Sequence, residues 1–201
     1  MHAFEHSPST PVLRGNRNDW IQNMTNLYLD VVENRSVLEI ASNTGDISQE
    51  ILQYSPTTLT MIDPDPRSTR IKNIELINDD VVSWLPNSPK FDVVVCFGLF
   101  YHLHNGLYLV ELIVNHCRPE YLVLDCVVAP HPLAFNKEKI NHEGYRWVNK
   151  GWKHAPFNLN VPFHIFNESL WYMGYDCMQT HKLCYDFFEK SNHWVGQWRI
   201  R

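Results

Sequence analysis

The sequence predicts an α/β fold with a doubly wound, mostly parallel seven-stranded sheet, an antiparallel last strand and helices on both faces. Between residues 37 and 128, short apolar stretches typical of buried parallel strands alternate with helical or polar segments. After residue 174, two further apolar stretches are joined by a linker too short for a comfortable helical crossover. Such a linker indicates an antiparallel pair at the end of the sheet.

The predicted elements begin with a polar, proline-bearing segment, residues 1–18, which we expect to be a flexible arm. A helical pattern then starts at Trp20, with Asn18 or Asp19 as its N-cap. The predicted strands are 37–41, 58–62, 74–77, 91–97, 121–128, 175–183 and 194–200. The later predicted helices are 45–54, 65–72, 105–117 and 168–173, the last with Asn167 as N-cap and Gly174 at its C-terminal end.

The length of 201 residues fits one domain with its own core. We divide it into an N-terminal arm and helix, 1–35, and a main domain, 36–201, in which 129–166 is an insertion. The five cysteines show no C-x-x-C spacing, which is typical of reduced thiols in a cytoplasmic protein. No signal peptide is visible, and the longest apolar run, 93–101, is much shorter than the ~20 residues of a membrane-spanning helix, so we expect no membrane association.

The net charge of −5 argues against a protein that coats nucleic acid by charge alone. The charge is unevenly distributed, because the segment 129–166 carries +3 and the rest of the chain −8. This segment is also rich in aromatic residues and histidine. Aromatic walls with a few polar groups fit a small-molecule pocket, and they also fit stacked bases beside phosphates.

The strongest functional feature is the segment VLEIASNTGDIS, residues 37–48, an apolar strand that carries an acid and turns through small residues into a helix. Open α/β sheets bind ligands at the carboxyl ends of their strands, and such a turn presents backbone N–H groups and a helix N-terminus there. Asp63 closes the next strand 24 positions after Glu39. A carboxylate at that point can accept both hydroxyls of a ribose.

These segments resemble class I S-adenosylmethionine (SAM)-dependent methyltransferases. Residues 37–48 are similar to motif I of the family, with Glu39 in the acidic position. The three glycine positions of the motif are occupied by Ala41, Asn43 and Gly45, and asparagine tolerates positive φ better than most residues. The resemblance implies SAM as cofactor and, in this part of the chain, the cofactor-binding residues Glu39, Ala41, Ser42, Asn43, Gly45, Asp63 and Pro64.

The resemblance extends to two later loops. In NDDVVSWLP it implies a hydrogen bond between the adenine amino group and Asp80, helped by the Val81 backbone, with Asp79 as the rival acid. In FDVVVCFGLFYHLHN the backbone after the strand lines the methionine end of SAM. The residues implied there are Cys96, Phe97 and Gly98.

The catalytic candidates follow the same strand. His102 falls where the family often has a histidine, so we predict that it handles protons, with Tyr101 as the second candidate. The alternative is a histidine that only fixes the loop by hydrogen bonds. His102 and His104 lack a third ligand of clear spacing, so we predict no metal site.

The resemblance covers roughly residues 36–128 and 167–201, and it implies that 129–166 builds the acceptor site. The reversed final strands and the lack of G-x-G-x-x-G distinguish the chain from a dinucleotide-binding domain that uses NAD. The first hypothesis is therefore a SAM-dependent methyltransferase acting on a small, anionic molecule. The second is the same reaction on RNA or a tRNA base, and the third is a non-catalytic SAM-binding module. The acceptor atom and the oligomeric state stay open.

Overall fold

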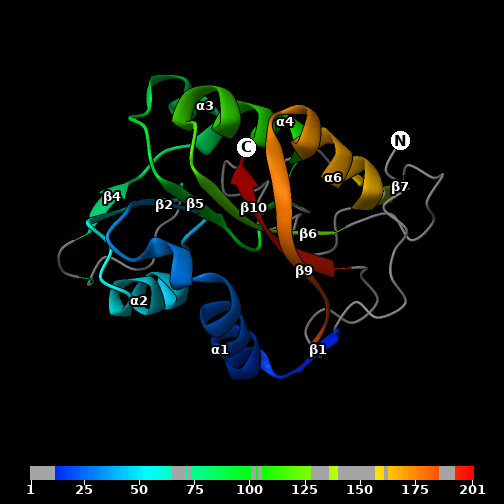
Figure 1. The fold of residues 1–201 in the computed structure, drawn as a ribbon, viewed down its shortest axis with the longest axis horizontal. Helices are drawn as coiled ribbons and strands as arrows, with labels where there is room; N and C mark the ends of the chain where they lie inside the picture. The colour runs from blue at the N-terminus through cyan, green and yellow to red at the C-terminus, as the bar shows by residue number, and fades with distance from the viewer. Residues whose placement is uncertain are drawn as a thin grey trace.

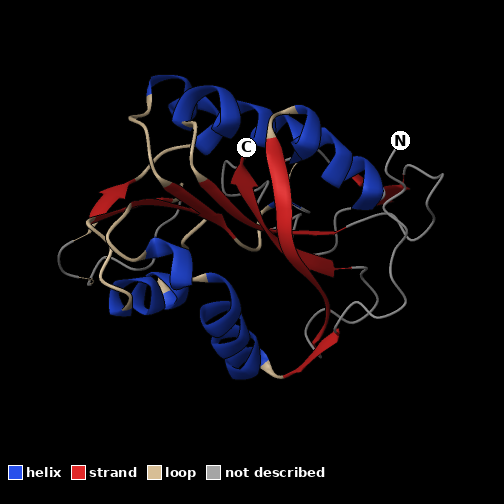
Figure 2. Ribbon diagram, viewed as in Figure 1, coloured by secondary structure: helices blue, strands red, loops and turns tan. Residues whose placement is uncertain are grey.

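The computed structural model describes residues 12–64, 71, 74–100, 103, 106–127, 136–139, 157–160, 163–185 and 193–201. One eight-stranded sheet has the order β1-β9-β10-β6-β5-β2-β3-β4, and a separate two-stranded sheet pairs β7 with β8. Helices lie on both sides of the large sheet (Figures 1 and 2).

The strands of the large sheet are β1 (Val12–Gly15), β2 (Ser36–Ile40), β3 (Thr58–Ile62), β4 (Glu75–Ile77), β5 (Val93–Cys96), β6 (Tyr121–Val127), β9 (Tyr175–Tyr185) and β10 (His193–Ile200). The small sheet consists of β7 (Asn136–Lys139) and β8 (Phe157–Asn160). The α-helices are α1 (Arg17–Tyr28), α2 (Asp46–Gln53), α3 (Val81–Trp84), α4 (Gly106–Leu112) and α6 (Phe163–Tyr172). Three short helical turns complete the described elements: η1 (Asp30–Val32), η2 (Leu85–Asn87) and the π-helix η4 (Ile113–Cys117).

All seven predicted strands form, and the predicted doubly wound fold is confirmed. The strands β2 to β6 pair in parallel, whereas β10 runs antiparallel to both of its neighbours, β6 and β9. The predicted antiparallel last strand is therefore also confirmed. β10 lies inside the sheet, between β6 and β9.

Two apolar clusters fill the space between the sheet and its helices. One cluster joins Leu38 and Ile40 to residues of α4 and α6, and the other joins Val37 to residues of α1 and α2. Because successive side chains of a strand point to opposite faces, a strand that is buried on both faces must be apolar throughout. The same alternation places Glu39, the acid within β2, on the face that α1 and α2 cover (Figure 1).

The predicted flexible arm is wrong for part of its length. Residues 12–15 form β1, an eighth strand, which pairs in parallel with the end of β9. The sequence does not reveal this strand because its partner lies some 170 positions later in the chain. Residues 1–11 lie outside the described part of the chain.

The predicted N-caps of the first helix are also wrong. Asn16 caps α1, and its side chain accepts hydrogen bonds from the backbone N–H groups of Asn18 and Asp19, which lie inside the helix. The Asp19 carboxylate in turn accepts the Asn16 N–H at 2.7 Å. This reciprocal capping box satisfies more of the unpaired N–H groups than Asn18 or Asp19 would as a single cap.

The last helix begins earlier than predicted. α6 starts at Phe163, so Asn167 lies within the helix instead of capping it. Phe166 and Leu170 are both buried one helical turn apart, and this apolar spacing extends the helix toward its N-terminus. Gly174 follows with φ of 96°, as predicted for the C-terminal end. The predicted helix 65–72 falls almost wholly outside the described residues.

In the part of the chain that the structure describes, no helix has the length and apolar character needed to cross a membrane.

Candidate functional site

The site lies where the order of the sheet reverses. β2 has β3 on one side and β5 on the other, and all three strands are parallel, so their carboxyl ends meet at one edge. Ligands of open α/β sheets bind in the crevice that forms outside such a switch point. The loops that follow β2, β3, β4 and β5 are therefore the candidate binding elements.

The loop between β2 and α2 holds three residues in the left-handed conformation. Ala41, Asn43 and Gly45 have φ of 62°, 45° and 78°. These are the three positions where motif I usually has glycine, so the backbone keeps the shape of the motif although one glycine remains. The Ala41 N–H donates to the Ile62 carbonyl of β3 at 2.9 Å, which anchors the start of the loop.

Asp63, at the end of β3, connects the two neighbouring loops. Its Oδ2 accepts the Asn43 N–H at 2.9 Å, and the residue is 1% exposed. A carboxylate offers about four acceptor positions, so this bond is compatible with further donors such as ribose hydroxyls. Pro64, the next predicted residue, lies on the surface.

Glu39 is buried beneath the loop. The Ser48 hydroxyl in the first half of α2 donates a hydrogen bond to Glu39 Oε2. Burial and the nearby charges of Asp63 and Asp46 raise the pKa of Glu39 to about 8, although the Ser48 bond acts in the opposite direction. Glu39 is therefore largely protonated at neutral pH, and it ties the strand to the helix instead of presenting a charge.

Ser42, in the same loop, has a buried hydroxyl without a partner in the described chain. A buried polar atom without a partner costs roughly 1–3 kcal/mol. The left-handed loop, the neighbouring Asp63 and this unpaired hydroxyl together fit a polar cofactor such as SAM.

Asp80 lies after β4 at the same edge of the sheet and caps the short helix α3, which was not among the predicted helices. Its Oδ1 accepts the Ser83 N–H at 3.1 Å, while Asp79 Oδ1 accepts the Asp80 N–H at 2.7 Å. Asp79 is thus engaged with its neighbour's backbone. Val81, the first residue of α3, is buried.

The loop after β5 is shaped by contacts on both faces of the sheet. Cys96 packs into the cluster beneath α4, whereas Phe97 packs on the other face, with its ring 6.0 Å from the Trp20 ring of α1. Burial raises the pKa of the Cys96 thiol, so this cysteine stays protonated and serves packing. Gly98 is left-handed, with φ of 77°. Its N–H donates to Asp125 Oδ1 of β6 at 2.7 Å.

Asp125 is a buried acid at this edge of the sheet that was not among the predicted site residues. It is fully buried, and burial raises its pKa to about 7 against the opposing effect of the Gly98 hydrogen bond. The available signal was an acid inside the apolar run YLVLDCVV, the same kind of signal that marks Glu39 in VLEI. The predicted catalytic residues, Tyr101 and His102, lie outside the described residues and stay predictions.

A protein-family model described as "Methyltransferase domain" matches residues 13–167. The chain therefore belongs to the methyltransferase domain family, and its predicted resemblance to class I SAM-dependent methyltransferases is confirmed. The match ends before β9 and β10, which complete the sheet.

Solved methyltransferase structures share the fold. Magnesium protoporphyrin IX methyltransferase (ChlM) from Synechocystis PCC 6803 with bound S-adenosylhomocysteine (SAH) has a TM-score of 0.63 at 9% identity, covering 93% of this chain and 89% of that one. The N-terminal domain of EvdMO1 with SAH has a TM-score of 0.69 at 13% identity, covering 93% and 86%. The N-methyltransferase NodS from Bradyrhizobium japonicum WM9 with SAH has a TM-score of 0.60 at 16% identity, and the match covers 92% of this chain and 88% of that one. None of the curated proteins matches the sequence.

Substitutions at Ala41 test the strain in the loop. Ala41→Gly should raise the free energy of unfolding by up to about 1 kcal/mol. Glycine removes the strain of a left-handed non-glycine residue, which is roughly 1–2 kcal/mol, but its greater freedom in the unfolded chain cancels part of this gain. Ala41→Val should lower it by about 2 kcal/mol, since β-branched residues fit this region worst. Urea unfolding measures both. Thr57→Val, at an exposed position with ordinary backbone, should change little. Equal changes in the free energy of unfolding for glycine and valine would contradict the left-handed conformation of residue 41.

The buried proton of Glu39 predicts a pH dependence. Because folding raises the pKa from 4.5 to about 8, the folded chain keeps a proton that the unfolded chain loses, so stability falls as pH rises between these values. Glu39→Gln stays neutral at every pH and lacks this slope, which is up to about 1.4 kcal/mol per pH unit. The stability of the variant relative to wild type should therefore increase from pH 5 toward pH 8 in urea unfolding. The exposed Glu33→Gln is the control. A constant difference between Glu39→Gln and wild type would show that Glu39 is ionised in the folded protein.

Proposed function

We propose that this methyltransferase uses SAM to methylate a small-molecule acceptor that carries negative charge. The observation that carries the proposal is the loop between β2 and α2, whose three left-handed residues are tied to the Asp63 carboxylate at the switch point of the sheet. This arrangement offers a ribose acceptor beside the left-handed loop, and membership of the methyltransferase domain family supports SAM as its ligand.

Methyl transfer requires of the protein mainly that it position the acceptor and the cofactor. When bound, SAM supplies a methyl group on a sulfonium, and transfer is a one-step displacement that needs the acceptor atom in line with the breaking bond. The β2 and β3 loops hold the nucleoside end, with Asp80 after β4 as the proposed partner of the adenine amino group. The loop after β5, at Phe97 and Gly98, faces the methionine end.

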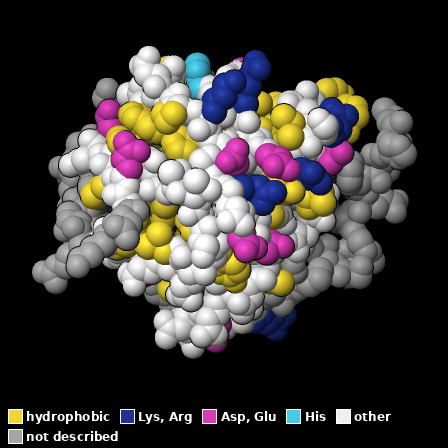
Figure 3. Space-filling view, turned by 60° about the vertical axis from the view of Figure 1, so that its left-hand side comes forward, with side chains coloured by type: hydrophobic (Ala, Val, Ile, Leu, Met, Phe, Trp, Pro, Cys, Tyr) yellow, Lys and Arg dark blue, Asp and Glu magenta, His cyan; other side chains and the backbone are white. Residues whose placement is uncertain are grey.

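A small acceptor is supported by what the similar structures are named for. ChlM is a magnesium protoporphyrin IX methyltransferase, and the EvdMO1 domain was also solved in the presence of SAH and D-fucose. The negative charge is supported by the +3 excess of residues 129–166, the segment that we propose builds the acceptor site. On the face seen in Figure 3, Lys and Arg lie interspersed with Asp and Glu, which does not resemble the continuous basic stripe of a protein that binds RNA along its surface.

Calorimetry tests the cofactor assignment. We expect the wild type to bind SAM and SAH and not NAD. Asp63→Asn keeps the size of the side chain and removes its charge, and hydrogen bonds to a charged group contribute roughly 1.5–3 kcal/mol, so the affinity for both ligands should fall tenfold or more. Binding of NAD with no binding of SAM or SAH would overturn the proposal.

A second variant separates ligand contact from damage to the fold. Ser42→Ala removes a hydroxyl that has no partner among the described residues, so the stability of the free protein should not fall, while SAH affinity drops several-fold. Asp30→Asn, an exposed acid in η1, is the matched control for Asp63→Asn and should bind SAH as the wild type does.

The charge of the acceptor is tested with matched pairs of amines or phenols that differ only in a carboxylate or its amide. The anionic member should be methylated faster at low ionic strength, and its advantage should shrink as salt screens the basic segment. Production of SAH from SAM is the readout. Equal rates for both members at low salt would contradict an anionic acceptor, and salt-sensitive methylation of RNA would support the nucleic-acid hypothesis instead.

A further inference from the structure

Phe97 and Gly98 form the turn by which the chain leaves β5, at the edge of the sheet where the candidate site lies. Gly98 has φ of 77°, which a strand does not adopt, so the residues after Cys96 have left the hydrogen-bond ladder of the sheet. A segment outside the ladder keeps one conformation only if contacts with other elements hold it there.

Gly98 is held through the last strands of the sheet. Its N–H donates to Asp125 Oδ1 of β6 at 2.7 Å. Asp125 is paired with Val195 of β10, and the Val195 carbonyl accepts a long hydrogen bond, 3.5 Å, from the Tyr28 hydroxyl. Tyr28 is the last residue of α1, so one end of this helix is connected to Gly98 through β10 and β6.

Phe97 is held by the other end of the same helix. Trp20, in the first turn of α1, contacts Phe97 edge to face, with 6.0 Å between the ring centroids and an interplanar angle of 71°, which is a favourable aromatic geometry. Trp20, Met24 and Tyr28 are spaced four apart and therefore lie along one face of the helix. Met24 and Tyr28 are fully buried, whereas Trp20 is only partly buried. One face of α1 thus contacts both β10 and the turn after β5.

We propose that Trp20 is a positioning residue, whose indole holds the turn at Phe97 and Gly98 in the conformation that binds ligand. This inference rests on the proposed function, in which the turn faces the methionine end of SAM. Loss of the indole removes the contact that restrains the Phe97 ring, so the free protein populates the binding conformation for a smaller fraction of the time. The apparent affinity falls by that fraction, because Trp20 acts through Phe97.

Calorimetry with SAH tests this role. Trp20→Ala should lower the affinity about tenfold, and Trp20→Phe, which keeps an aromatic edge against Phe97, should stay within about threefold of the wild type. Phe97→Leu removes the ring on which the indole acts. Adding Trp20→Ala to Phe97→Leu should therefore lower the affinity no further, since the two residues act as one unit.

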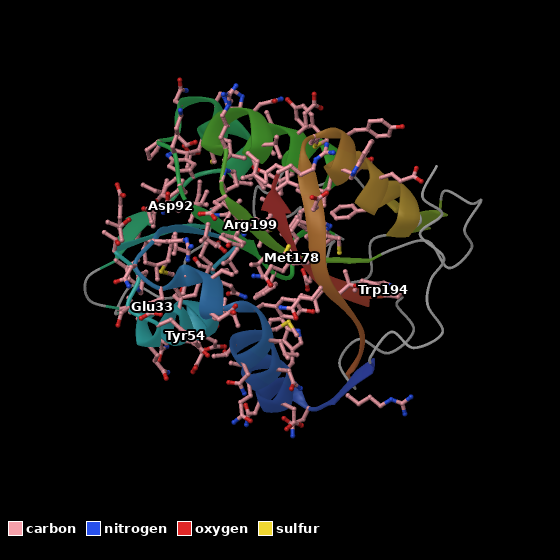
Figure 4. The ribbon with its side chains drawn as sticks, viewed as in Figure 1. Glu33, Tyr54, Asp92, Met178, Trp194 and Arg199 are labelled. Atoms are coloured by element: carbon pink, nitrogen blue, oxygen red, sulfur yellow. The ribbon has the colours of Figure 1, made fainter. Side chains whose placement is uncertain are left out.

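The matched control is Trp171→Ala. Trp171, near the end of α6, also contacts an aromatic ring edge to face, that of Tyr172 at 5.1 Å. It lies at the opposite edge of the sheet, because α6 leads into β9, whose first residue pairs with Ile200. Figure 4 shows Arg199, the neighbour of Ile200, and Trp194 at opposite ends of β10. This variant should lower the midpoint of urea unfolding and bind SAH as the wild type does.

Hydrogen exchange of the Gly98 amide gives a second measurement, without any ligand. This N–H exchanges only when its bond to Asp125 opens. In Trp20→Ala it should exchange about tenfold faster than in the wild type, because the turn opens locally, while the Val94 amide inside β5 keeps its rate. Trp171→Ala should leave the rates of both amides unchanged.

The outcomes separate the positioning role from the proposed function. If Trp20→Ala binds SAH as the wild type does, the positioning role is overturned and the function stands. An equal loss in Trp171→Ala, or a further loss on combining Trp20→Ala with Phe97→Leu, also overturns it. If the wild type does not bind SAH, the proposed function fails, and the exchange of Gly98 decides alone: a faster rate in Trp20→Ala supports the hold on the turn, and an unchanged rate overturns it.

Discussion

The hydrogen bond from the Asn43 amide to the Asp63 carboxylate is the contact on which the site depends. It joins the loop after β2 to the acid at the end of β3. A loop with left-handed residues at positions 41, 43 and 45 needs such external support, because each non-glycine residue there is strained. The burial of Asp63 strengthens the bond, since a carboxylate shielded from water interacts more strongly with a backbone dipole.

Three buried acids lie at this edge of the sheet, and each has different hydrogen-bond partners. Asp63 accepts a hydrogen bond from a backbone amide, Glu39 accepts one from the Ser48 hydroxyl, and Asp125 has one oxygen bonded and one without a donor in the described chain. A fold that needed only stability would replace such groups by apolar side chains, because buried acids cost more than they contribute. At this edge, Asp125 Oδ2 and the Ser42 hydroxyl oxygen are buried without a hydrogen-bond partner in the described chain, which is consistent with the SAM site that we propose.

The sequence predicted the parts of this protein that local patterns determine. Continuous apolar strands and their alternation with helices located β2 to β6, and the short linker after β9 located the reversed β10. Contacts between distant segments were hidden: β1 requires β9 as its partner, and the hydrogen bond between Gly98 and Asp125 requires the pairing of β5 with β6. The same distinction holds for the site residues. Glu39 and Asp63 could be predicted because they belong to recognisable sequence motifs, whereas Asp125 belongs to none.

The placement of β10 between β6 and β9 also limits when this protein can fold. A chain emerging from the ribosome exposes β6 as an open edge until residues 193–200 have been synthesised and inserted beside it. The strand made before it, β9, has no described neighbour other than β1 until that moment. β10 thus joins β9 and β1 to the other five strands of the large sheet, so the nascent protein passes through a stage in which the edge of β6 is unpaired and open to other chains.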